Sequence, residues 1–157
     1  MKKTLLLLLL LGSFLSFSQE KKQTLNVFTF SEVEKIQRQN PKPIIVFITT
    51  DWCKICHGMK STTLKDRDII QILNDKFYFI KLNGEEKEDI TFLEKTFVYK
   101  PTGTNTGLHE LANQLGFMGN VITYPTTTFL NSNFEIDLQL TGFYNSKRMK
   151  QILDKYK

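Results

Sequence analysis

The clearest pattern in the chain is an apolar run at residues 44–48, Ile-Ile-Val-Phe-Ile, which follows a proline-rich break. A short run that is apolar at every position predicts a central strand whose two faces are both covered. A second run at residues 77–82 predicts the next strand, and Ile69, Ile70 and Leu73 at helical spacing predict a helix between the two. Strand, helix and strand in this order predict a right-handed parallel crossover.

The second half of the chain predicts antiparallel strands and a final helix. Residues 126–130 are rich in β-branched side chains, and residues 134–140 alternate with a period of two after a turn at 131–133. Ser146 is expected to cap a last helix with Met149, Ile152, Leu153 and Tyr156 on one face. Together these elements predict an α/β fold whose central mixed sheet is flanked by helices.

The remaining elements are less sharply defined. We expect a short strand at residues 25–30, a capping box over Ser31–Glu34 that opens a helix ending near Arg38, and helices at 53–64 and 67–74. The acidic stretch that follows residue 83 predicts a short helix through Phe92, Leu93 and Phe97, and residues 108–115 predict another.

Residues 1–18 have the pattern of a cleavable secretory signal peptide. Lys2 and Lys3 precede seven consecutive leucines, and Ser16-Phe17-Ser18, with its two small serines, precedes Gln19. The apolar stretch is shorter than the roughly 20 residues that span a bilayer, which favours cleavage over anchoring. We therefore expect one domain over residues 19–157 in an exported protein, periplasmic or secreted and soluble after cleavage.

The charge pattern argues against nucleic-acid binding. The full chain carries +5, to which Lys2 and Lys3 contribute two, and its acids and bases are interspersed without an arginine-rich stripe. The thirteen phenylalanines are more consistent with a core than with a base-stacking platform. We therefore expect a monomeric, single-domain protein with protein partners and no nucleic acid.

Cys53 and Cys56 are the only cysteines, and they follow the first apolar strand directly. At a strand-to-helix junction the first sulfur lies at the positive end of the helix dipole, which favours the thiolate, and the second lies one turn further on. This position predicts a redox dithiol. A purely structural disulfide is less consistent with the pattern, because a four-residue loop constrains little of the unfolded chain.

Two other chemistries use the same residues. Cys53-Lys54-Ile55-Cys56-His57 matches the motif for covalent haem attachment, with Met59, Met118 or Met149 as a second axial ligand. The sheet-rich pattern disfavours this reading, because small haem domains of that type are generally helical. A zinc site from Cys53, Cys56, His57 and His109 has enough ligands, but neighbours on a helix point about 100° apart. No metal and no cofactor beyond the dithiol are expected.

Three features together resemble the thioredoxin superfamily, and within it exported thioredoxin-related proteins similar to the C-terminal domain of the transmembrane thiol-disulfide interchange protein. They are the strand with Trp52 and the Cys-x-x-Cys pair, Tyr124-Pro125-Thr126 before a strand, and Gly142 before the last helix. The resemblance runs from about Val27 to Tyr156. It implies a thioredoxin fold with an insertion, about residues 84–107, before a cis-proline.

The resemblance also implies roles for individual residues. Cys53 would be the attacking thiolate and Cys56 the resolving thiol, joined as a redox-active disulfide. Trp52, Tyr124 and Pro125 would contact the substrate, with Pro125 in a cis peptide bond and the backbone of Tyr124 paired with an extended segment.

One departure from the family concerns the proton of the resolving thiol. Many thioredoxins carry a buried acid six positions before the first cysteine, where this chain has Phe47. Our hypothesis is that His57 or Lys60 influences Cys56 instead, while Lys54 adds positive charge near Cys53.

The expected function is an exported protein-disulfide oxidoreductase, with reductase the favoured direction and a membrane protein as electron donor. A haem-binding electron carrier and a thioredoxin-fold binding module with an inert dithiol are the alternatives.

Overall fold

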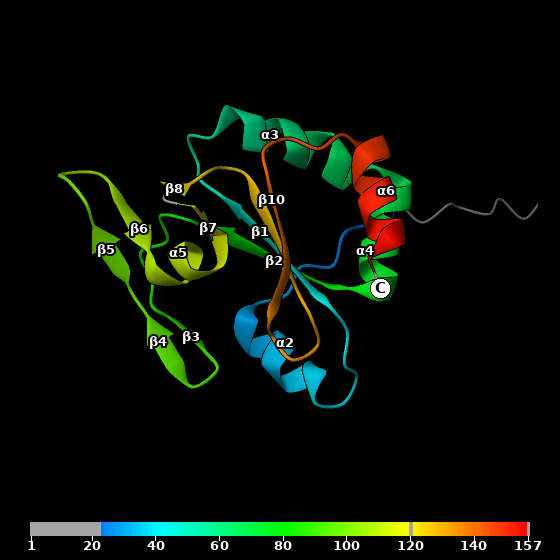
Figure 1. The fold of residues 1–157 in the computed structure, drawn as a ribbon, viewed down its shortest axis with the longest axis horizontal. Coiled ribbons are helices and arrows are strands. Elements are labelled where there is room, and N and C mark those ends of the chain that lie inside the picture. Colours follow the sequence, from blue (N-terminus) through cyan, green and yellow to red (C-terminus); the bar gives the residue numbers. More distant parts are fainter. Residues whose placement is uncertain (1–22, 120, 157) are drawn as a thin grey trace, which may run out of the picture.

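The computed structural model describes residues 23–119 and 121–156, so the predicted signal peptide lies outside the described residues. A four-stranded sheet in the order β10-β9-β1-β2 forms the centre of the molecule (Figure 1). Its strands are β1 (Ile44–Thr49), β2 (Tyr78–Asn83), β9 (Thr126–Leu130) and β10 (Ile136–Thr141). The flanking helices are α2 (Phe30–Gln37), α3 (Lys54–Ser61), the 3-10 helix η2 (Thr63–Lys65), α4 (Arg67–Lys76), α5 (Glu110–Gly116) and α6 (Ser146–Lys155).

The sheet is mixed, as the sequence predicts. β1 pairs in parallel with β2, from Ile44 opposite Tyr78 to Thr49 opposite Asn83. β9 pairs antiparallel with both β1 and β10. All six residues of β1 are buried, which confirms the prediction of a central strand covered on both faces. The α/β class with a mixed central sheet flanked by helices is likewise confirmed.

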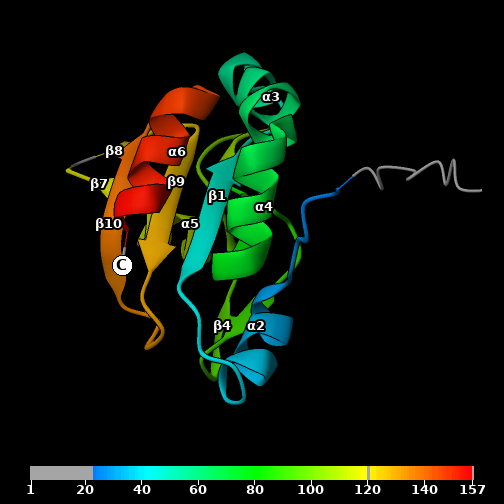
Figure 2. The same ribbon diagram turned by 90° about the vertical axis from the view of Figure 1, so that its right-hand side faces the viewer.

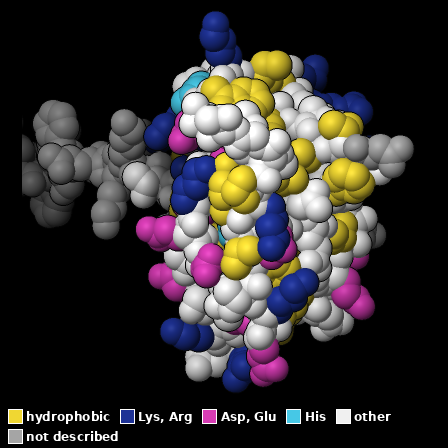
Figure 3. Space-filling model, turned by 90° about the vertical axis from the view of Figure 1, so that its left-hand side faces the viewer, with side chains coloured by type: hydrophobic (Ala, Val, Ile, Leu, Met, Phe, Trp, Pro, Cys, Tyr) yellow, Lys and Arg dark blue, Asp and Glu magenta, His cyan; other side chains and the backbone are white. Residues whose placement is uncertain are grey.

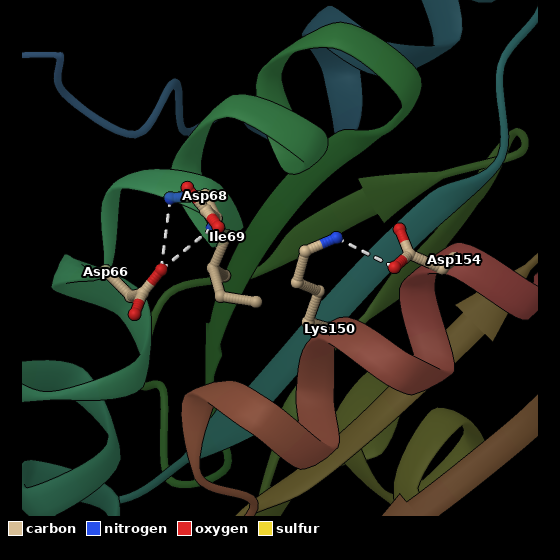
Figure 4. A network of polar contacts seen from close by, with 5 residues as sticks. All are labelled: Asp66, Asp68, Ile69, Lys150 and Asp154. Carbon is tan, nitrogen blue, oxygen red and sulfur yellow. Dashed lines mark hydrogen bonds and ion pairs between the residues drawn. The ribbon is translucent and has the colours of Figure 1, made fainter.

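One face of the sheet is covered by α3, α4 and α6, which stand in front of the strands in Figure 2. Ile45 and Phe47 of β1 pack there against side chains from all of these helices, including Met59, Leu73 and Leu153. Polar contacts hold the helix ends in this layer (Figure 4). The Asp66 carboxylate accepts hydrogen bonds from the backbone N–H groups of Asp68 and Ile69 at the start of α4, and Lys150 pairs with Asp154 on α6 at 2.8 Å.

The opposite face is covered by α2 and α5. Val46 and Ile48 of β1 pack there in a second apolar cluster with Phe30 and Val33 of α2 and Leu111 of α5. Each face of the sheet therefore has its own helical layer, and successive residues of β1 alternate between the two layers.

The helix caps differ from the predicted ones by one or two positions. Thr29, not Ser31, caps α2, and its reciprocal partner in the capping box is Glu32. Asn145, not Ser146, caps α6. The strand predicted at residues 25–30 is reduced to one bridge between Phe28 and Ile80, because Phe30 already belongs to α2.

The helix predicted through Phe92, Leu93 and Phe97 is wrong. These residues lie on a hairpin of β3 (Ile90–Phe92) and β4 (Lys95–Phe97), and Leu93 and Glu94 turn with φ of 52° and 62°, in the left-handed region. Two further hairpins follow, β5 (Tyr99–Pro101) with β6 (Gly107–His109), and β7 (Phe117–Met118) with β8 (Val121–Ile122). Among residues 23–119 and 121–156, no helix combines the length and hydrophobicity needed to cross a membrane.

Candidate active site

Cys53 occupies the junction between the central strand and α3. It is the N-cap residue of the helix, with extended backbone angles, and its Sγ accepts a hydrogen bond of 3.1 Å from the backbone N–H of Cys56. The two sulfurs form a disulfide with an S–S distance of 2.02 Å. An N–H group and the positive end of the helix dipole thus both face the first sulfur, and both stabilise a thiolate there after reduction.

The two cysteines differ in their access to solvent. Cys53 is 5% exposed and Cys56 is fully buried. Two residues next to them in the sequence are exposed to solvent: Trp52 is 64% exposed and Ile55 is 56% exposed. Of the two cysteines, only Cys53 therefore has any exposed surface, and the exposed Trp52 directly precedes it.

The peptide bond between Tyr124 and Pro125 is cis, as the resemblance implies. Thr126 pairs with Ile48 near the end of β1, so Pro125 lies level with the segment that leads into the dithiol. The Tyr124 ring meets the edge of Trp52, with ring centroids 5.8 Å apart. Trp52, the cysteines, Tyr124 and Pro125 are thus brought together at the carboxyl end of β1.

Tyr124 also joins the dithiol region to the segment after β2. A Cβ atom on Gly84 would collide with the Tyr124 ring, so only glycine permits this approach. Gly84 is held on both sides, because its N–H donates to Thr49 and its carbonyl accepts from His109. Burial, with a smaller contribution from Glu85, raises the pKa of Tyr124 to about 12.

Phe47, at the position where the resemblance would place an acid, is buried in the apolar layer under α3 and stacks on Phe79. Its partners in register are Lys81 on β2 and Thr127 on β9. The hydroxyl of Thr127 is buried and has no hydrogen-bond partner among the described residues. Burial, followed by the charges of Lys60 and Lys65, lowers the pKa of Lys81.

The residues predicted to tune the dithiol are more dispersed. Lys54 is exposed at the start of α3, and the ring of His57 contacts the backbone carbonyl of Asp51 at 2.8 Å. Lys60 lies one turn beyond Cys56 and lines a cavity together with Lys65 and Lys81. The roles assigned to all eight site residues remain predictions.

Two neighbours of the site were missed in the sequence. Phe143 is 48% exposed and its ring lies close to Gly58 of α3; its position directly after Gly142 was the available signal. Lys81 was the single charge in an otherwise apolar strand. Figure 3 shows hydrophobic side chains gathered near the upper part of this side of the molecule. The exposed hydrophobic residues beside the start of α3 and in the β7–β8 hairpin are Trp52, Ile55, Phe117, Met118 and Val121.

The residues proposed for zinc are not grouped around one point. Within the described part of the chain, no three His, Cys, Asp or Glu side chains are placed to hold a metal ion. His109 is buried in the segment after β2, where its Nδ1 accepts a hydrogen bond from the N–H of Leu111.

Curated proteins match only part of the chain. It is 33% identical over 66 residues to the uncharacterized protein B0495.5 of Caenorhabditis elegans, and 29% identical over 65 residues to spermatogenesis-associated protein 20 of Homo sapiens. These matches cover 42% and 41% of this chain but only 9% and 8% of the relatives. The chain therefore spans less than a tenth of the length of these relatives.

Solved structures are similar over most of the fold. A thioredoxin from Thermus thermophilus has a TM-score of 0.59 at 17% identity, covering 84% of this chain and 86% of that one. DsbH oxidoreductase has 0.56 at 16%, covering 85% and 87%, and the reduced DsbD C-terminal domain of Neisseria meningitidis has 0.52 at 16%, covering 80% and 90%. The sequence model of the family described as thioredoxin-like domain matches residues 30–157. The chain belongs to this thioredoxin-like family, and its Cys53–Cys56 pair is consistent with thiol-disulfide oxidoreductase activity.

Proposed function

We propose that the protein is an exported thiol-disulfide oxidoreductase that reduces disulfides in protein substrates. The observation that carries the proposal is the placement of Cys53: it caps α3, receives the N–H of Cys56, and lies beside the exposed Trp52. Once the disulfide is reduced, a sulfur in this setting is stabilised as a thiolate.

The reaction begins with the reduced dithiol. The Cys53 thiolate attacks one sulfur of a substrate disulfide, forms a mixed disulfide and displaces the other substrate sulfur as a thiolate, which takes up a proton. Cys56 then loses its proton and attacks the Cys53 sulfur. The Cys53–Cys56 disulfide forms, the second substrate thiol leaves, and two electrons have passed to the substrate.

The segment before Pro125 supports recognition of the substrate backbone. Tyr124 packs on Trp52 at the edge of the site, so an extended substrate strand can pair with the Tyr124 backbone while its cysteine faces Cys53. In this proposal the chain acts as a monomer on protein thiols and disulfides, and no nucleic acid takes part.

Each turnover leaves the dithiol oxidised, so a reductant must restore it. We infer that a membrane protein carrying a dithiol supplies the two electrons by the same exchange in reverse. The predicted signal peptide at residues 1–18 supports export to the periplasm or the medium, where such a donor is needed.

Trapping of the mixed disulfide tests the proposal. Cys56→Ser, reduced and mixed with insulin, is expected to form a covalent adduct through Cys53 that dithiothreitol releases. Cys53→Ser is the matched control and is expected to form none. An adduct of equal yield on both variants, or on neither, would contradict the assigned roles.

A further inference from the structure

A second site lies on the α3 and α4 side of the molecule. A cavity of about 630 Å³ opens between these helices, the edge of β2 and the segment before α2. That segment runs beside α4 (Figure 2), where Asn74 binds the backbone of both Thr24 and Asn26. The volume is typical of small-molecule sites.

The cavity brings together positive charges from separate elements. Lys60 comes from α3, Lys65 from η2 and Lys81 from β2, and Arg67 of α4 also lines it. No acidic side chain of residues 23–119 or 121–156 is among the lining residues. The nearby Asp66 carboxylate is already occupied, because it caps α4.

The lysines are close enough to affect one another. Burial lowers the pKa of Lys81, and the charges of Lys60 and Lys65 lower it further. Like charges held together repel, so the three lysines favour an anion that neutralises them. Apolar side chains of Leu25, Leu64 and Ile70 complete the lining.

We propose that this cavity binds a small anion that carries two or more phosphate or carboxylate groups. Three ammonium groups from three elements can each pair with a different anionic group of one ligand. A single monovalent ion has only one such group. A cavity of this size with three partly exposed lysines fits a compact ligand better than a nucleic-acid strand, which needs a continuous basic groove. The proposal does not depend on the redox function.

Isothermal titration of the purified protein with pyrophosphate, and in parallel with citrate, at constant ionic strength tests this site. Saturable binding of one ligand per chain is expected for at least one of the two. Pyrophosphate alone would indicate a phosphate ligand, and citrate alone a carboxylate. If neither binds saturably, the proposal is wrong.

Variants identify the location. Lys81→Gln is expected to weaken binding by about tenfold, or about 1.4 kcal/mol, whereas Lys81→Arg retains the charge and the affinity.

The triple variant Lys60→Gln, Lys65→Gln and Lys81→Gln is expected to abolish binding. Its matched control, Lys35→Gln, Lys147→Gln and Lys155→Gln, removes the same charge from exposed positions elsewhere. Equal loss in both triple variants would overturn the site in favour of general charge attraction. Thermal unfolding of each variant shows whether it is folded.

Discussion

On one face of the sheet, α3, α4 and α6 cover Ile45 and Phe47 of β1; on the other, α2 and α5 cover Val46 and Ile48. Both layers are apolar, and both contain large aromatic side chains. The dithiol helix belongs only to the first layer. The hairpins that follow β2 belong to the second, where Phe92 and Phe97 join the core.

The two layers therefore have different roles: the first positions the dithiol, and the second supports Tyr124 beside it. The first layer fixes α3, so that Cys53 and Cys56 lie at the end of β1. The second layer holds Tyr124 in place, because Gly84 contacts its ring and accepts a hydrogen bond from His109 at the end of β6. The site is therefore assembled where the two layers meet, at the carboxyl end of the central strand.

The largest expected effect comes from removing the attacking sulfur. Cys53→Ser should lower the rate of insulin reduction by about 1,000-fold or more, because a serine hydroxyl is not ionised as a thiolate is. The rate is measured as turbidity of the released chains with dithiothreitol as reductant. A variant that retains a tenth of the wild-type rate would place the chemistry elsewhere.

The next effect compares the two layers directly. Phe47→Ala and Phe97→Ala each remove a buried ring, and each should lower the free energy of unfolding by about 3–5 kcal/mol. Urea unfolding measures both. If Phe97→Ala costs less than about 1 kcal/mol, the β3–β4 hairpin is not an integral part of the second layer.

A smaller effect is expected at the start of α2. Thr29→Ala removes a side-chain cap and should cost about 1 kcal/mol. Hydrogen bonds from Thr29 hold the pKa of Glu32 below its usual value, so their contribution is present above the unfolded pKa and is lost as the pH falls. Urea unfolding at neutral and acidic pH should therefore show a smaller loss from the substitution in acid; an unchanged loss would argue against the charge-assisted cap.

The last effect is confined to alkaline pH. Folding raises the pKa of Tyr124 from 10.0 to about 12, so the folded state favours the neutral phenol. That contribution is complete below pH 10 and is lost as the pH rises toward 12. Between these values the wild type should lose stability more steeply than Tyr124→Phe in urea unfolding. Parallel pH profiles would show that the phenol is not buried as described.

The sequence was informative where pattern and fold coincide. The apolar run at β1, the alternation in β10 and the Cys-x-x-Cys pair each carry a local signal, and their elements were predicted within a few residues. The cis bond at Pro125 came only from the family resemblance. The placement of the dithiol relative to that proline depends on pairing between β1 and β9, which are far apart in the chain.

The errors have physical causes. The aromatic residues at 92 and 97 suit a helical face as well as a hairpin, and the choice depends on the left-handed turn at Leu93 and Glu94, residues that rarely adopt it. The cap of α2 was predicted at Ser31 instead of Thr29, because two overlapping four-residue sequences, 29–32 and 31–34, both satisfy the capping-box pattern. The proximity of Lys81 to the site was not predicted, because it depends on tertiary packing. Only the fold places Lys81 opposite Phe47 in the sheet and in the same cavity as Lys60.

The reduction potential of the Cys53–Cys56 couple, titrated against glutathione or dithiothreitol in the purified protein, tests the proposed reductase most directly. A value near about −270 mV is predicted, because a protein that reduces others must hold its electrons as weakly as thioredoxin does. A value near about −120 mV would make the protein a donor of disulfides and would contradict the proposed direction. A pair that does not titrate at all would contradict the redox function itself.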